Sequence, residues 1–270
     1  ILSLSCINVI LATSLNLING YTGLFSIGHA GFLAIGAYSS AVLTKYFGVP
    51  YPAALLAGGL LAGAAGIMVG LPTLRLRGDY LAIATLGFGE IIRVIIVNID
   101  QLTVGGKLLD IGGPRGLMAI PKFTTFAWTY VLAILTIKFL VNFTNSTHGR
   151  ACISIREDEV AAEAMGVNTT LYKVTAFAMG AFFAGVAGGL FSHLYMFVHP
   201  DSAGFLKSVD YLVMTVVGGL GSTTGAALAA VVLTVLSEAL RSVAAQLEAA
   251  AVRMVIYALL LVVIMLSRPQ

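Results

Sequence analysis

The sequence predicts an all-α fold, a polytopic transmembrane helical bundle of about eight to nine membrane segments with glycine-broken spans. Hydrophobic residues make up 59% of the 270 residues and charged residues only 10%, and the mean hydropathy is +0.97. Because a soluble domain carries roughly 25% charged residues, this chain could not cover a water-facing surface. Several apolar runs reach the roughly 20 residues that a membrane-spanning helix needs, and the short alternating segments of a membrane barrel are absent from the sequence.

The apolar runs follow one another along the chain, and no soluble domain separates them. The two runs around Gly218–Gly225 are short, so they form either one broken span or two half-spans that meet at a turn. The chain opens on Ile1 inside an apolar run without a basic segment, which we interpret as a trimmed start rather than a signal peptide. The expected spans are 2–18, 24–45, 52–71, 80–98, 127–145, 172–197, 207–220, 224–240 and 251–267.

Basic residues in the short loops indicate the orientation, because Lys and Arg favour the cytoplasmic side. We therefore expect 146–171 to be a cytoplasmic loop and 99–126 an external loop, provided that the fourth and fifth spans each cross once. The basic residues expected on the cytoplasmic side are Arg75, Arg77, Arg150, Arg156, Lys173 and Arg268. The opposing charges in the external loop are Lys107, Arg115 and Lys122, partly offset by Asp100 and Asp110.

The segment 148–173, HGRACISIREDEVAAEAMGVNTTLYK, is a polar island in an otherwise apolar chain. The acidic residues at 157–159 favour the start of a helix, where negative charge opposes the positive end of the helix dipole. Gly166 can close this helix in a left-handed turn, and Asn168 or Thr169 can cap the next span. One small apolar face then comprises Val160, Ala161, Ala164 and Met165. We expect a short amphipathic helix of two to three turns, suited either to a groove on another protein or to an ordinary solvated loop.

The polar island closely resembles the cytoplasmic coupling loop of permeases from branched-chain amino acid ABC importers. Further stretches that resemble this family are SLNLINGYTGLFSIGHAGFLAIGAY at 14–38, GGPRGL at 112–117, VVGGLGSTTGAALAAVVLTVLSEALR at 216–241 and the closing MLSRPQ. The resemblance is closest to the LivM-like member of the permease pair, and the stretch 103–111 departs from the family pattern. It implies that 1–270 is a single ABC importer transmembrane domain in a bacterial or archaeal cytoplasmic membrane, without a cofactor.

The resemblance also implies partners. These are two ABC ATPase subunits, a second, similar permease subunit in a heterodimer or homodimer, and an extracytoplasmic binding protein that delivers Leu, Ile or Val. The chain contains no G-x-x-x-x-G-K-[ST] phosphate loop, so we expect it not to be an enzyme and ATP hydrolysis to occur in the partner subunits. The residues expected to dock the ATPase are Arg156, Glu157, Asp158, Glu159, Ala162, Met165 and Gly166. Reversing the charges of Glu157 and Glu159 together should then uncouple transport or release the ATPase.

Glycines recur throughout the spans, and most are expected to let helices approach closely, as small residues do in lipid. A minority can break a helix and turn backbone amides toward a substrate, as in many transporters. The best candidates are Ser26–Gly31 and Gly218–Gly225, and Gly28, Gly31 and Gly36 are expected to interrupt the second span. The expected translocation path comprises Ser26, Gly28, His29, Gly31, Thr85, Glu90, Gly218, Gly219, Gly221 and Ser222.

Few ionisable residues lie deep in the expected spans. Glu90 lies about 15 Å into the fourth span, and Arg93 three residues later can neutralise it, so the pair is either structural or functional. Glu238 and Arg241 repeat this spacing near a span end. His29 and His193 are lone histidines for which packing is favoured over ligand contact, and we expect no metal site.

Other classes of function stay open. The same importer class also carries urea, short amides or other small amino acids. An ion-coupled secondary transporter would place a coupling carboxylate in the membrane, with Glu90, Asp210 or Glu238 as candidates, but it would have no use for the acidic island. An intramembrane enzyme is disfavoured because no nucleophile and base can be paired, and the sequence holds no nucleic-acid-binding patch.

Overall fold

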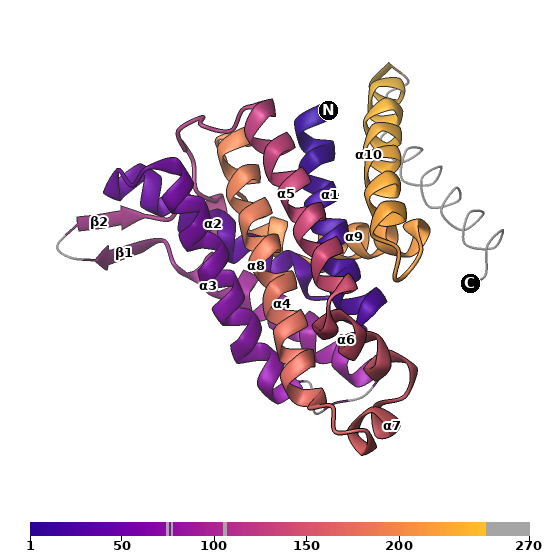
Figure 1. Ribbon diagram of the computed structural model, residues 1–270. Coiled ribbons are helices and arrows are strands. Elements are labelled where there is room, and N and C mark those ends of the chain that lie inside the picture. Colours follow the sequence, from indigo (N-terminus) through magenta and orange to yellow (C-terminus); the bar gives the residue numbers. More distant parts are fainter. Residues whose placement is uncertain (74–75, 77, 105–106, 247–270) are drawn as a thin grey trace.

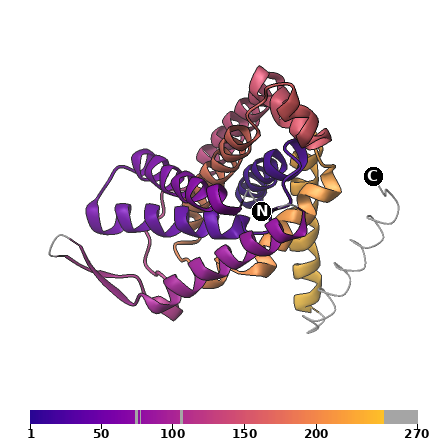
Figure 2. The same ribbon diagram turned by 90° about the horizontal axis from the view of Figure 1, so that it is seen from below.

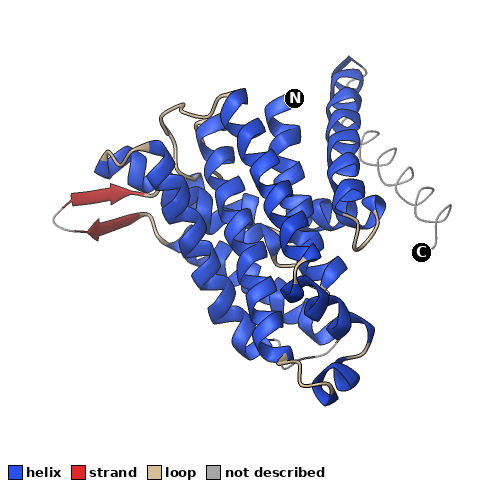
Figure 3. Ribbon diagram, in the orientation of Figure 1, coloured by secondary structure: helices blue, strands red, loops and turns tan. Residues whose placement is uncertain are grey.

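The computed structural model describes residues 1–246 except 74–75, 77 and 105–106, and these form a helical bundle with one small hairpin at its edge (Figures 1 and 3). Seen from below, α2, α3 and the hairpin lie on one side of the bundle and α10 on the other (Figure 2). The elements are α1 (Leu2–Asn16), η1 (Leu17–Tyr21), α2 (His29–Phe47), α3 (Tyr51–Thr73), α4 (Asp79–Asn98), β1 (Gln101–Val104), β2 (Lys107–Asp110), η2 (Gly113–Arg115), α5 (Phe126–Asn145), α6 (Thr147–Glu157), α7 (Glu159–Ala164), α8 (Thr169–Tyr195), η3 (Pro200–Ala203), α9 (Phe205–Gly218) and α10 (Thr223–Gln246).

Six helical segments in the described part of the chain are long and apolar enough to cross a membrane. This confirms the helical membrane bundle but not the count of eight to nine segments, because α2 and α9 are not among the six. The expected span at 251–267 lies outside the described residues, as do Arg75, Arg77 and Arg268. The six segments are Leu2–Tyr21, Tyr51–Thr73, Tyr80–Asn98, Phe126–Asn145, Thr169–Tyr195 and Thr223–Leu240.

The most extensive helix packing in the described part of the chain is among α2, α3 and α8, which approach one another through glycine. A Cβ on Gly36 of α2 would collide with the backbone of Gly185 in α8, and a Cβ on Gly188 would collide with the carbonyl oxygen of Leu33. A Cβ on Gly66 of α3 would lie 2.6 Å from the α8 methyl group of Ala181. These contacts confirm the packing role expected for the glycines, since any larger residue would push the helices apart.

The second span begins later than the sequence predicts. A π-helical turn, η1, follows α1, and residues 22–28 are not helical, so α2 starts at His29 rather than at residue 24. The chain therefore breaks before Gly28, whereas Gly31 and Gly36 lie inside the continuous helix α2 and do not interrupt it. Apolar composition alone could not separate these cases, because it continues across the break.

The external loop contains a two-stranded hairpin that the sequence analysis did not predict. Strands β1 and β2 pair antiparallel, with Gln101 opposite Asp110 and Val104 opposite Lys107. Two glycines between short apolar runs are a typical hairpin signal, and the stretch 103–111 carries it. An isolated bridge between Leu117 and Val198 ties the same loop to the segment that follows α8.

Candidate functional site

The polar island forms two short helices, α6 and α7, at the end of the bundle opposite the N-terminus (Figure 1). The predicted helix with acidic residues at its start is present as α7, which begins at Glu159 but spans six residues rather than two to three turns, and α6 precedes it. Between the two helices Asp158 is extended, with φ −156° and ψ 111°, and its Oδ1 accepts hydrogen bonds from the backbone N–H groups of Val160 (2.9 Å) and Ala161 (3.0 Å). An Asp in this position caps the free amides of the helix that follows, so Asp158 ends α6 and starts α7.

The predicted apolar face of the island points away from the rest of the chain. Val160 is 65% exposed and Met165 85% exposed, and Ala161 and Ala164 are exposed as well. Exposed Val and Met side chains of this kind form a surface that a partner can cover. The described residues leave this face, here called the α7 face and defined by these four residues, without a covering element.

The inner side of α7 is attached to the bundle. Ala162 is buried, and the carboxylate of Glu159 accepts from the ammonium of Lys173 at 2.5 Å, with the Lys173 side chain only 7% exposed. Ala162 and Glu159, both expected to dock a partner, therefore face the chain itself. Gly166 closes α7 with φ of +85°, and Asn168 accepts a backbone N–H of α8 at 3.0 Å, which confirms both capping predictions.

Arg156, at the end of α6, reaches back into the bundle. Its Nη1 donates to the carbonyl oxygen of Gly20 in η1 at 2.9 Å, and its Nη2 pairs with the exposed carboxylate of Glu157 at 2.5 Å. The stem of Arg156 lies so close to Gly23 that a Cβ there would be 2.7 Å from Cγ, and a Cβ on Gly221 would be 2.9 Å from Nη1. Arg156 thus joins the island to two chain segments that are far apart in sequence.

The turn between α9 and α10, residues 219–222, meets η1. The backbone N–H of Gly221 donates to Oδ1 of Asn16 at 3.0 Å, and the hydroxyls of Tyr21 and Thr223 lie 2.9 Å apart. Positive φ values of 92° at Gly219 and 82° at Gly221 require glycine in this turn. The predicted path residues of this segment are Gly218, Gly219, Gly221 and Ser222. The predicted break at Gly218–Gly225 is therefore present as this turn, and it packs against η1, which directly precedes the non-helical residues 22–28.

The remaining path residues gather where α2 begins beside α4. The backbone N–H of Ile27 donates to Oγ1 of Thr85 at 3.1 Å, and a Cβ on Gly28 would collide with the Thr85 carbonyl. Nε2 of His29 lies 2.9 Å from the Ser14 hydroxyl, while Nδ1 of His29 and the hydroxyl of Ser26 are buried without a partner among the described residues. The structure brings together Ser26, Gly28, His29, Gly31 and Thr85, and all five are buried or half-buried.

Glu90 of α4 belongs to a network that the sequence revealed only in part. It pairs with Arg93 at 3.4 Å, as the spacing predicts, and its Oε1 also accepts the backbone N–H of Phe205 at the start of α9 (3.2 Å). Arg93 pairs in addition with Asp201 of η3 at 2.9 Å. Asp201 was missed because a partner 108 residues away leaves no local pattern.

These charges are not buried. The side chains of Glu90 and Arg93 are 37% and 38% exposed, and Lys207 and Asp210 of α9 form a further exposed pair at 3.7 Å. We call this surface, formed by Glu90, Arg93, Asp201, Lys207 and Asp210, the α4–α9 face. Charged groups within a membrane region are costly against lipid, so such a face belongs against water or against another protein.

The other ionisable candidates have structural surroundings. Nε2 of His193 lies 2.8 Å from the Thr44 hydroxyl, its Nδ1 lies 2.7 Å from the Gly189 carbonyl, and the rings of Tyr51 and Phe123 flank it, which confirms the packing role. The side chain of Arg241, expected to pair with Glu238, lies outside the described residues.

Residues 1–265 match the family model described as the branched-chain amino acid transport system permease component. The chain belongs to this family. It is 38% identical over 275 residues to the high-affinity branched-chain amino acid transport system permease protein LivM of Escherichia coli, which covers 89% of this chain and 63% of that protein. The probable LivM of Methanocaldococcus jannaschii is 26% identical over 261 residues, or 81% of this chain and 74% of that protein.

The permease LivH of Salmonella typhimurium is also similar, at 34% identity over 145 residues, which is 52% of this chain and 45% of that protein. The chain spans about 63% of the length of the enterobacterial LivM proteins that it matches. No solved structure matches the chain.

Proposed function

We propose that this chain is the permease subunit of an ABC importer and forms the translocation path for leucine, isoleucine and valine. The observation that carries the proposal is the match of residues 1–265 to one permease family, whose members LivM and LivH are named for branched-chain amino acid transport. The chain itself supplies no phosphate loop, so the energy comes from separate ATPase subunits.

In this proposal, the α7 face docks an ATPase subunit. A small apolar patch beside the exposed carboxylate of Glu157 suits an apolar groove with a basic rim, as in many protein interfaces. Met165 and Val160 are its largest exposed side chains. Arg156, Glu159 and Ala162 face the bundle, and we assign them to positioning α6 and α7 rather than to contact with the ATPase.

The α4–α9 face lines the translocation path at the contact with the second, similar permease subunit. Its charged side chains can pair with both ends of a zwitterion, and the exposed Ile91, Val94 and Leu206, next to these residues in α4 and α9, suit a branched side chain. Ser26, His29 and Thr85 lie buried behind this wall, so they support the start of α2, and no tight substrate site is required. An extracytoplasmic binding protein supplies the selection.

We further propose that α2 and α9 are embedded in the membrane in addition to the six clear spans, which gives at least eight segments. The support is their packing, since α2 packs against both α3 and α8 and the buried side of α9 packs against α1 and α10. The membrane is the cytoplasmic membrane of a bacterium or archaeon, with α6 and α7 on the cytoplasmic side.

The test is uptake by proteoliposomes that hold the chain with its co-purified partners and the binding protein. We expect ATP-dependent uptake of labelled leucine, and none of labelled urea. Uptake of urea in place of leucine would overturn the assigned cargo. Uphill uptake by the chain alone on an ion gradient would overturn the importer class in favour of a secondary transporter.

A further inference from the structure

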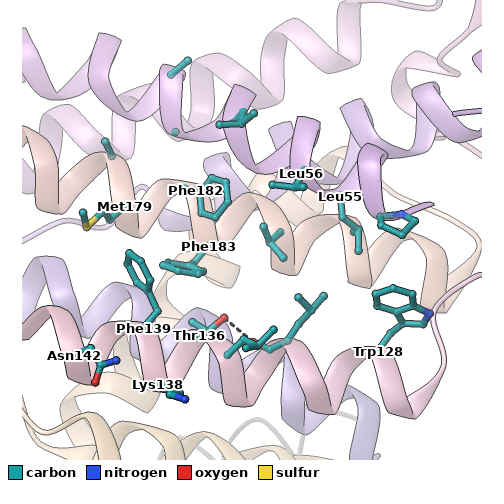
Figure 4. A pocket seen from close by; sticks show the side chains of 18 of the residues that line it. Leu55, Leu56, Trp128, Thr136, Lys138, Phe139, Asn142, Met179, Phe182 and Phe183 are labelled. Carbon is teal, nitrogen blue, oxygen red and sulfur yellow. Dashed lines mark hydrogen bonds between the residues drawn. The ribbon is translucent and has the colours of Figure 1, made fainter. Parts of the chain in front are cut away.

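A long apolar groove runs along the side of the bundle between α3, α5 and α8 (Figure 4). Its volume is about 960 Å³, and its lining consists almost entirely of aliphatic and aromatic side chains. Trp128 lies at one end, and Asn142 and Met179 lie at the other (Figure 4). The groove shares no residue with the α4–α9 face, so it is separate from the proposed path.

One cation interrupts this apolar lining. Lys138 of α5 lines the groove, is exposed, and forms no ion pair with any residue that the structure describes. It lies seven residues before the end of α5 at Asn145, or about 10 Å by helix rise. A lysine at this depth extends its ammonium toward the membrane surface, where an anion can neutralise it. Asn142, one turn further along α5, offers an amide N–H on the same side.

We propose that the groove binds an anionic glycerophospholipid from the leaflet on the α6–α7 side. The phosphate lies against Lys138 and Asn142, and one acyl chain lies along the groove toward Trp128. Fourteen residues of α5 separate Asn142 from Trp128, or about 21 Å, which exceeds half of a hydrocarbon core of about 30 Å, so the acyl chain must lie extended along the groove to reach Trp128.

The composition of the groove selects this ligand over two others. No Asp or Glu is among its lining residues, so nothing pairs with the cation of a choline headgroup, and an anionic headgroup is favoured. A zwitterionic amino acid could pair its carboxylate with Lys138 but would leave its ammonium unpaired against aliphatic walls, which costs several kcal/mol, so the groove is not a substrate path. A helix of another subunit would fit only if it placed a carboxylate of its own against Lys138.

Trp128 is the only tryptophan in the chain, so its fluorescence reports on the groove. The full chain with any co-purified partners is placed in nanodiscs of phosphatidylcholine with a minor fraction of phosphatidylglycerol, and bromine on the acyl chains of one lipid or the other quenches the fluorescence. The signal from Trp128 is the difference between the wild type and Trp128→Phe. We expect brominated phosphatidylglycerol to quench at least threefold more than an equal mole fraction of brominated phosphatidylcholine.

Three variants decide the role of the lysine. Lys138→Met should abolish the preference for phosphatidylglycerol, Lys138→Arg should keep it, and the control Lys122→Met, in the external loop, should leave it unchanged. Equal quenching by both headgroups in the wild type, or an unchanged preference in Lys138→Met, would overturn the proposal. If neither brominated lipid quenches Trp128 and a photo-crosslinker at Leu135 reacts with another polypeptide, a partner helix fills the groove and the proposal fails. None of these outcomes depends on transport, so they do not test the proposed function.

Discussion

Replacement of Arg156 by Met should separate docking of the ATPase from its effect on the membrane helices. The variant keeps the unbranched stem that packs beside Gly23, but it removes the Nη1 donor to the carbonyl oxygen of Gly20. A hydrogen bond from a charged group contributes about 1.5–3 kcal/mol, whereas the exposed pair with Glu157 contributes about 0–1 kcal/mol. If the bond to Gly20 carries the coupling, its loss lowers the coupling equilibrium by roughly 10- to 150-fold.

The assay uses proteoliposomes that contain the assembled importer. Leucine uptake and the leucine-stimulated part of ATP hydrolysis are measured beside the affinity of the ATPase subunit for the permease. We expect Arg156→Met to reduce the first two at least tenfold and to change the affinity less than threefold. The matched control is Arg150→Met, because Arg150 is exposed on the same helix and bonds only locally, to Asn145 and Thr147.

Two results would refute this reasoning. Full coupling in Arg156→Met would show that the contact with Gly20 transmits nothing. An equal loss of coupling and of ATPase affinity would show that Arg156 is a docking residue after all, as the sequence suggested.

Three further predictions concern the same end of the molecule. Met165→Glu on the exposed α7 face should weaken ATPase binding about tenfold, because burying a methionine contributes about 1.5–3 kcal/mol. The control Thr170→Ala should leave the affinity unchanged. Binding is measured by interferometry, and equal affinities of Met165→Glu and the wild type would exclude the α7 face as the docking surface. Glu159→Gln should lower the melting temperature, since it leaves the buried Lys173 ammonium unpaired at a cost on the order of 3 kcal/mol. The double variant Glu159→Gln with Lys173→Met should recover most of this loss. If the two changes in melting temperature simply add in the double variant, Glu159 and Lys173 do not stabilise the fold as a pair. Burial raises the pKa of the Cys152 thiol, and a hydrogen bond with a threonine hydroxyl partly offsets this rise. Maleimide labelling of Cys152 should therefore begin only at a pH above the usual thiol range, whereas the exposed thiol of Met165→Cys should label readily. Rapid labelling of Cys152 at pH 7 would refute the burial.

The sequence predicted those features that depend on neighbours along the chain. Apolar runs give the spans because a membrane helix must be apolar along its whole length. Gly166 and Asn168 were identified as helix ends because capping needs only residues within one turn. The hairpin of the external loop was missed although Gly-Gly between apolar runs indicates one, because strands were not expected in this class of protein.

The features that the sequence could not predict depend on partners far away in the chain. Glu159 was assigned to docking because it lies in an acidic run, yet its partner Lys173 is 14 residues away. Arg156 does pair with Glu157 of that charged run, but its bond to Gly20, 136 residues away, left no local pattern. Asp158 could equally extend a helix or cap one, and only the fold decides between these roles.

The helix breaks inside the bundle are each stabilised by a side chain from another element. Asn16 accepts the N–H of Gly221, Glu90 accepts that of Phe205, and Thr85 accepts that of Ile27. A backbone amide without a partner in a membrane costs several kcal/mol, so these bonds hold the breaks in a fixed geometry. Movement of α6 would then reach the membrane segments as a displacement of the junction between η1 and the α9–α10 turn rather than by unwinding of either segment. Arg156 of α6 contacts both parts of this junction, so if the ATPase docks at α7 as proposed, Arg156→Met tests whether movement of α6 reaches the membrane segments through this guanidinium.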